Sequence, residues 1–228
     1  MKKIYRILAL ISTIAFLPFH PAGLSRKVSA AVQVPETVRI GIFYSGLSAH
    51  NLNTAVPDID VSAEKGLHLG FLKSGVFNHL HDVAGSDAVK IRKDSYFVKT
   101  AEGFKQYSPS AGKIPAGERV GPYHVRIGKT FTDLKSAKAR VDALKQKGIP
   151  AFPVYDDSWQ VWTGFFADGA KAGQGMEALK EKLGSEPVSV IEPSGSRIAV
   201  FSSAGEALVL FGSSTAFFRI QPKKENVP

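Results

Sequence analysis

The chain contains no cysteine among its 228 residues. This absence excludes disulfide bonds and thiol catalysis, and it leaves only histidine and carboxylate side chains for a zinc site. A phosphate-binding loop is also missing, because no glycine in the cluster at positions 169, 173 and 175 is followed by Lys-Ser or Lys-Thr. No serine–histidine–aspartate order or paired carboxylates stand out either. We therefore expect no cofactor, no metal site and no catalytic residues.

The first thirty residues have the pattern of a secretory signal peptide. A basic start precedes an apolar run from Ile7 to Phe19, and the small residues Ser29 and Ala30 follow. The apolar run is too short to span a bilayer comfortably. We expect cleavage after Ala30 or Ala31, and the alternative is a retained segment that would be the chain's only contact with a membrane.

If residues 1–30 are removed on export, the net charge of the remaining chain is smaller. Five of the 29 basic residues and none of the 20 acidic ones lie in residues 1–30, so the remaining chain carries a formal charge of +4. This mild excess suits a protein that works beside an anionic wall or membrane surface. Nucleic acid is not an expected partner, because an exported chain would rarely meet it.

A pattern that occurs twice, 36 residues apart, is the most informative feature of the chain. Tyr123 corresponds to Trp159, and the next pairs at this offset are Val125 with Val161, Gly128 with Gly164 and Gly148 with Gly184. A fixed period indicates a duplicated supersecondary unit. Each copy predicts a strand, a helix and a strand. The strands are expected at 123–127, 151–155, 159–163 and 188–191, and the helices from Thr132 to Lys147 and from about Lys171 to Leu183.

The predicted fold class is α+β. The duplicated segment should form a βαββαβ module, with a four-stranded antiparallel sheet and two helices on one face. Alternating residues predict strands in the flanks at 38–44, 59–63, 66–71, 89–92, 96–99, 197–201, 207–211 and 217–221. The expected organisation is a signal peptide (1–30), a β-rich segment (31–100), a Gly/Pro-rich linker (101–119), the module (120–192) and a β-hairpin tail (193–228) that completes the N-terminal β body.

Residues 120–192 resemble a SPOR domain, the sporulation-related repeat. The first half matches at Tyr123–Gly128, Phe131, Ala137, Leu144 and Gly148, and the second at Val161–Phe165, Leu179 and Gly184. The resemblance implies binding to the glycan strands of peptidoglycan, and therefore an exported protein of the bacterial cell wall.

A second similarity lies at the start of the chain. Residues 35–44 and 61–67 are similar to the opening of SpoIID/LytB-type proteins. This resemblance implies a role in sporulation or wall remodelling as a targeting or amidase-modifying module, with a cell-wall amidase as a further partner. The alternative is the N-terminal part of a lytic transglycosylase whose catalytic domain lies beyond residue 228.

Six residues are the candidate glycan contacts. Side chains alternate along a strand, so His124 and Arg126 should face away from the helices, as should Gln160 and Trp162. Lys129 is expected at the edge of this face and Tyr155 at its rim. An open face with an aromatic ring and hydrogen-bonding groups suits a sugar.

The candidate residues also have simpler structural interpretations. Trp162 could be covered by another segment, such as residues 101–122, and Arg126 and Lys129 could be solvated surface charges. The histidines at 68, 79 and 81 with Asp82 suggest a metal site, but their spacing fits no strong motif and exposed loop histidines are expected instead. An RNA-binding sheet shares the βαββαβ order, but the signal peptide argues against it.

Overall fold

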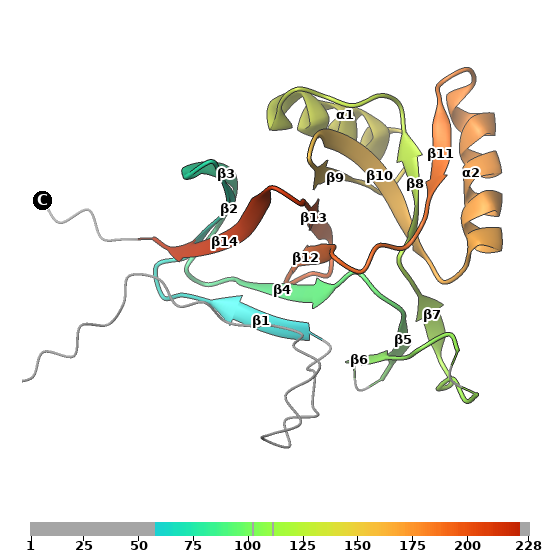
Figure 1. Ribbon diagram of the computed structural model, residues 1–228, viewed down its shortest axis with the longest axis horizontal. Helices are drawn as coiled ribbons and strands as arrows, with labels where there is room; N and C mark the ends of the chain where they lie inside the picture. Colours follow the sequence, from blue (N-terminus) through green and yellow to red (C-terminus); the bar gives the residue numbers. More distant parts are fainter. Residues whose placement is uncertain (1–57, 102, 111, 224–228) are drawn as a thin grey trace, which may run out of the picture. The chain divides into compact units, whose positions relative to one another are not determined.

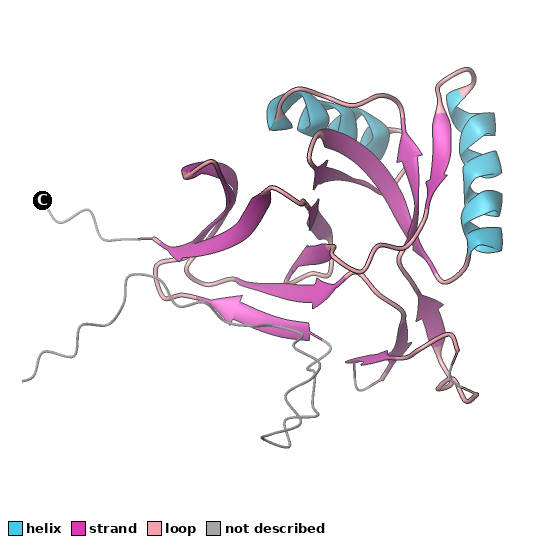
Figure 2. Cartoon of the chain, in the orientation of Figure 1, coloured by secondary structure: helices cyan, strands magenta, loops and turns pink. Residues whose placement is uncertain are grey.

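The computed structural model describes residues 58–101, 103–110 and 112–223 (Figure 1). These residues fall within one compact unit, Gly41–Pro228, whereas the other unit, Met1–Ile40, lies outside them. The expected signal peptide and the expected strand at 38–44 also lie outside the described residues. Strands outnumber helices (Figure 2), and the α+β class is confirmed.

Two helices and fourteen strands are described, and their bounds are as follows. The helices are α1 (Leu134–Gln146) and α2 (Gly169–Leu183). The strands are β1 (Asp58–Ser62), β2 (Leu67–Lys73), β3 (Val76–Val83), β4 (Ala88–Lys93), β5 (Phe97–Thr100), β6 (Gly103–Gln106), β7 (Glu118–Val120), β8 (Tyr123–Ile127), β9 (Ala151–Asp156), β10 (Trp159–Phe166), β11 (Val188–Ile191), β12 (Ile198–Ser202), β13 (Ala207–Gly212) and β14 (Ala216–Pro222).

The largest sheet has eight strands in the order β1-β4-β12-β13-β9-β10-β8-β11. The duplicated segment supplies one half of it, from β9 to β11, with antiparallel pairing between neighbours. The expectation of a separate four-stranded sheet needs correction, because β13 pairs in parallel with β9 and continues the sheet. The pairing occupies backbone groups that an edge strand would leave free.

The two helices begin and end at residues that their sequences indicate. Asp133 caps α1 by accepting a hydrogen bond from the backbone N–H of Ser136 at 2.8 Å, and Asp168 caps α2 in the same way through Lys171 at 2.8 Å. Helix α2 ends at Leu183 and is capped by Gly184, whose φ of 65° lies in the left-handed region that glycine tolerates. Both helices pack on the β9–β11 half of the large sheet (Figure 1).

Two smaller three-stranded sheets accompany the large one. The first has the order β14-β2-β3, so the last described strand pairs with one near the start. The second has the order β6-β5-β7. Strand β6 lies within residues 101–119, where a linker was expected, and β7 begins there. Strand β3 was not predicted, because its sequence Val-Phe-Asn-His-Leu-His-Asp-Val lacks a sustained alternation.

The large sheet has an apolar core on each face. Neighbouring residues of one strand belong to different cores, as Val161 and Trp162 do on β10 and Val209 and Leu210 do on β13. The first core contains the inward residues of α1 and α2 and of the β14-β2-β3 sheet. The second contains Phe152, Val154, Trp162, Ala199, Phe201 and Leu210. Burial on both faces therefore holds the duplicated segment between other parts of the chain.

Within the part of the chain that the structure describes, neither helix has the length and hydropathy that crossing a membrane requires.

Candidate functional site

The face of the large sheet opposite the helices carries four of the six candidate contacts. Val125 is fully buried in the helix-side core, and His124 and Arg126 therefore face the other way. Arg126 lies directly across from Trp162 in the β8–β10 pairing, and Gln160 lies two residues before Trp162 on β10. The predicted orientation of these side chains agrees with the packing.

The expectation that this face is open is wrong. His124 is 0% exposed, Trp162 1% and Gln160 8%. The guanidinium of Arg197 lies 5.1 Å from the centroid of the Trp162 ring, and Phe201 of β12 joins the same core. Arg197 directly precedes β12, and the apolar residues Ala199, Phe201 and Leu210 of the same core lie on β12 and β13, which continue the sheet beyond the duplicated segment. Their apolar side chains remove the aromatic residues of β9 and β10 from water, which is favourable for each of them by roughly 1.5–3 kcal/mol.

A buried network of charged groups fixes His124 within this face. The carboxylate of Asp94 accepts hydrogen bonds from His124 Nε2 at 3.1 Å and from Arg197 Nε at 2.9 Å. The other ring nitrogen of His124 lies 2.6 Å from the carbonyl oxygen of Gly164. Arg197 also donates to the carbonyl oxygens of Pro122 and Glu192. The network joins residues that follow β4, lie in β8 and precede β12, so it connects the duplicated segment to both flanks.

A second buried cation lies on the same side of the sheet. Arg92 of β4 has its guanidinium within 4.5–5.4 Å of four ring centroids, those of Phe97, Phe104, Phe165 and Phe201. Burial lowers the pKa of Arg92 to about 10, against the opposing effect of Asp94. The guanidinium still keeps its charge at neutral pH, and the rings attract it through their faces.

The three candidates outside this buried group are Tyr155, Arg126 and Lys129. Tyr155 is on the helix-side face, where its ring stacks on Phe71 at 4.3 Å and its hydroxyl accepts a hydrogen bond from Lys73. The expected place at the rim of the opposite face is therefore wrong. The physical reason is that the β14-β2-β3 sheet packs on β9 there. Arg126 is partly exposed and Lys129 is exposed. Only these two of the six candidates are accessible to a large ligand.

Three of the four residues that the sequence analysis considered as a metal site and set aside lie together on the β2–β3 hairpin. His68 Nδ1 is 2.6 Å from Asp82 Oδ1, and His79 Nε2 is 3.2 Å from the same oxygen. The ligand atoms of these three residues lie within 4.8 Å of one another, so they could hold a metal ion. Hydrogen bonds from His79 and then His68 lower the pKa of Asp82 to about 2. The histidines lie on strands, whereas loop positions were expected.

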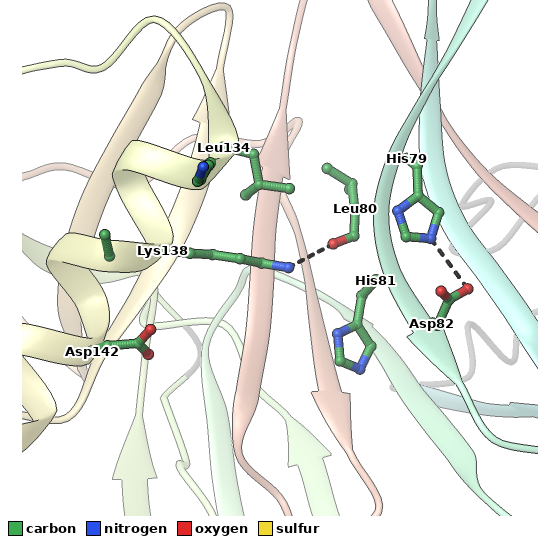
Figure 3. Close-up of a pocket in the computed structure, with 9 residues that line it drawn as sticks. His79, Leu80, His81, Asp82, Leu134, Lys138 and Asp142 are labelled. Atoms are coloured by element: carbon green, nitrogen blue, oxygen red, sulfur yellow. Dashed lines mark hydrogen bonds and ion pairs between the residues drawn. The ribbon is translucent and has the colours of Figure 1, made fainter.

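An open groove of about 710 Å³ runs between β3 and α1. Figure 3 shows Lys138 of α1 reaching across it toward β3, where its Nζ donates to the carbonyl oxygen of Leu80 at 2.8 Å. His81 lines the groove, and the pKa of its imidazole is lowered by burial and by the charge of Lys138. His79 and Asp82 of the cluster line the same groove, so the cluster lies beside His81 on one hairpin.

Comparison with known proteins identifies the central part of the chain. The family model of the SPOR domain matches residues 120–191, which include the helices α1 and α2 and the strands β8 to β11. No curated protein and no solved structure matches the chain. SPOR domains generally bind peptidoglycan and occur in extracytoplasmic proteins that bind the cell wall. The chain therefore contains a SPOR domain at residues 120–191.

Proposed function

We propose that this protein is exported and binds the glycan strands of peptidoglycan through its SPOR domain. The match of the family model to residues 120–191 carries the proposal. The small positive charge of the chain beyond residue 30 supports it as well, because bacterial walls are anionic. In this role the protein positions itself, or a partner, at the cell wall.

The glycan contacts are proposed for the accessible part of the sheet face. Arg126 lies in β8, and its neighbour across the strands is Ser189 of β11, the last strand of the large sheet. All four residues of β11 are partly exposed, and Lys129 lies in the exposed turn after β8. Arginine and lysine donate hydrogen bonds, and the hydroxyl and acetamido oxygens of a glycan accept them. A strand of sugar bound along β8 and β11 would meet both cations.

The buried candidates have a supporting part in this proposal. His124, Gln160 and Trp162 are buried on the face opposite the helices, and Tyr155 is buried on the helix-side face. All four stabilise the packing of the sheet. Replacing any of them would disturb the fold, so a loss of binding in such a variant would not identify a contact. Exposed residues make the informative substitutions.

Co-sedimentation with purified sacculi tests the proposal. The unmodified chain should sediment with the sacculi, and the double variant Arg126→Ala with Lys129→Ala should stay largely in the supernatant. Lys147→Ala is the matched control, because it removes an exposed lysine at the end of α1. Sacculi stripped of their peptides by an amidase then show whether bare glycan is preferred. Failure of the unmodified chain to sediment would overturn the function, and equal binding by the double variant would overturn the site.

We infer a finer role from the similarity of residues 35–44 and 61–67 to SpoIID/LytB-type proteins. The protein would act in sporulation or wall remodelling as a targeting module or as a modifier of a cell-wall amidase. Measuring amidase activity on sacculi with and without the purified chain tests this role. A change in the rate of peptide release supports it, and an unchanged rate contradicts it. Release of muropeptides by the chain alone would instead favour the lytic transglycosylase alternative.

A further inference from the structure

The β2–β3 hairpin contains an irregularity that places three polar side chains together. Leu69 pairs with His81 and Gly70 pairs with His79, which leaves Leu80 without a partner across the strands. In a regular strand, residues three positions apart point to opposite faces. The extra residue of this β-bulge brings His79 and Asp82 onto the same face instead. His68 lies directly across from Asp82 on that face.

The bulge also determines which residues of β3 lie on the opposite face, away from this group. His81 pairs with Leu69, a fully buried residue of the helix-side core, so His81 shares the face that packs toward α1. Leu80 is 3% exposed and belongs to that core. His68, His79 and Asp82 therefore form a group on the outer face of the sheet, and His81 is not part of it.

The distances within the group fit one small cation. The two histidine nitrogens lie 2.6 Å and 3.2 Å from Asp82 Oδ1, and all the ligand atoms lie within 4.8 Å of one another. A tetrahedral zinc ion with bonds of 2.0–2.1 Å holds its ligand atoms roughly 3.3 Å apart. The separations of 2.6 Å and 3.2 Å are close to this value, and the separation of the two histidine nitrogens is at most 4.8 Å. The ion would replace the hydrogen bonds by which both imidazoles now share one carboxylate oxygen.

We propose that His68, His79 and Asp82 form a binding site for a divalent transition-metal ion of the zinc type. Two imidazoles with a carboxylate suit Zn²⁺, Ni²⁺ or Cu²⁺, whereas Mg²⁺ and Ca²⁺ require oxygen ligands. The side chains of His68, His79 and Asp82 are 40%, 49% and 52% exposed, which leaves room for a water molecule as the fourth ligand. The site lies outside the SPOR domain and is independent of glycan binding.

The metal would join two strands of the β14-β2-β3 sheet. His68 belongs to β2, and the two other ligands belong to β3, so a bound ion links the strands on both sides of the bulge. A bulge lacks part of the regular pairing between strands, and the ion would stabilise the hairpin there. Lys223 opposes metal binding, since its Nζ lies 3.5 Å from Asp82 Oδ1 and competes for the carboxylate.

Titration calorimetry of the purified full chain, prepared without a polyhistidine tag, tests the site. The expected result with Zn²⁺ is one ion per chain. His68→Ala, His79→Ala and Asp82→Asn should each raise the Kd at least tenfold, whereas His81→Ala should leave it unchanged. Lys223→Ala should lower the Kd. Titration with Co²⁺ adds an absorption spectrum that reports the coordination geometry directly.

A thermal measurement separates loss of the site from loss of the fold. Zn²⁺ should raise the Tm of the unmodified chain and of His81→Ala, because an ion that binds only the folded state stabilises it. The Tm of His68→Ala should not respond, although its circular dichroism spectrum matches that of the unmodified chain. Either of two results would overturn the proposal: no saturable binding of Zn²⁺ or Co²⁺, or binding that His68→Ala and His79→Ala leave unchanged.

Discussion

Removal of the Asp94 carboxylate should destabilise the SPOR domain and its flanks together. Asp94 follows β4, outside the matched residues, and its side chain is 1% exposed. It accepts hydrogen bonds from His124 inside the domain and from Arg197 after it. The backbone N–H of Asp94 donates to the carbonyl oxygen of Arg197, and this bond persists in Asp94→Ala. The variant therefore isolates the contribution of the carboxylate.

The expected loss of stability is large. The side chain of Arg197 is 4% exposed and that of His124 is 0% exposed, so the variant leaves a buried guanidinium without its counter-charge and the Nε2 of a buried imidazole without its partner. Breaking a buried ion pair by removing one partner costs about 3–5 kcal/mol. Small proteins have a free energy of unfolding of about 5–15 kcal/mol in total. A single substitution should thus remove a substantial part of the stability of the chain.

Guanidinium denaturation followed by tryptophan fluorescence measures this effect. The two tryptophans, Trp159 and Trp162, are both buried and lie on opposite faces of the large sheet. Asp87→Ala is the control, because Asp87 is exposed in the turn before β4 and its removal should change the free energy by no more than about 0.5 kcal/mol. A difference below about 1 kcal/mol between the two variants would refute the reasoning.

Two further predictions concern aspartates at chain turns. Hydrogen bonds from Ser213, then from Ser214 and Thr215, lower the pKa of Asp157. The stability that this carboxylate contributes is therefore present above the unfolded-state pKa of about 3.9, and it is lost as the pH falls through the lower folded-state pKa. Asp157→Asn, which suits the local φ of 54°, should lower the Tm at pH 6, and this difference from the unmodified chain should narrow as the pH falls below the unfolded-state pKa. A difference that stays constant would contradict the assignment. Asp168→Ala removes the cap of α2 and should cost about 1 kcal/mol in denaturant unfolding, whereas an equal cost for the exposed Glu181→Ala would show that the cap is not responsible.

Local signals explain why the duplicated segment could be predicted well. The expected strands at 123–127 and 188–191 match β8 and β11, and the helix ends are close to those of α1 and α2. Capping aspartates, helix-stop glycines and the spacing of apolar residues all act within a few positions of one another. The orientation of His124 and Trp162 followed from strand alternation in the same way.

The accessibility of the candidate face could not be predicted, because distant residues decide it. Trp162 is covered by Arg197, which lies 35 positions further along the chain, and His124 is held by Asp94, 30 positions earlier. Nothing in the local pattern around β8 or β10 indicates these partners. The grouping of His68, His79 and Asp82 without His81 could not be predicted for a different reason, since the bulge at Leu80 interrupts the alternation that identifies a strand and shows which side chains share a face.

The parallel pairing of β13 with β9 has a consequence for where the folding unit ends. In a fragment limited to residues 120–191, one side of β9 would have unpaired peptide groups, and the Trp162 ring beneath Arg197 would be exposed to water. Such a fragment would self-associate through the unpaired edge of β9 and through its exposed apolar surface. In this protein the segment that matches the family model is therefore shorter than the segment that folds as one unit.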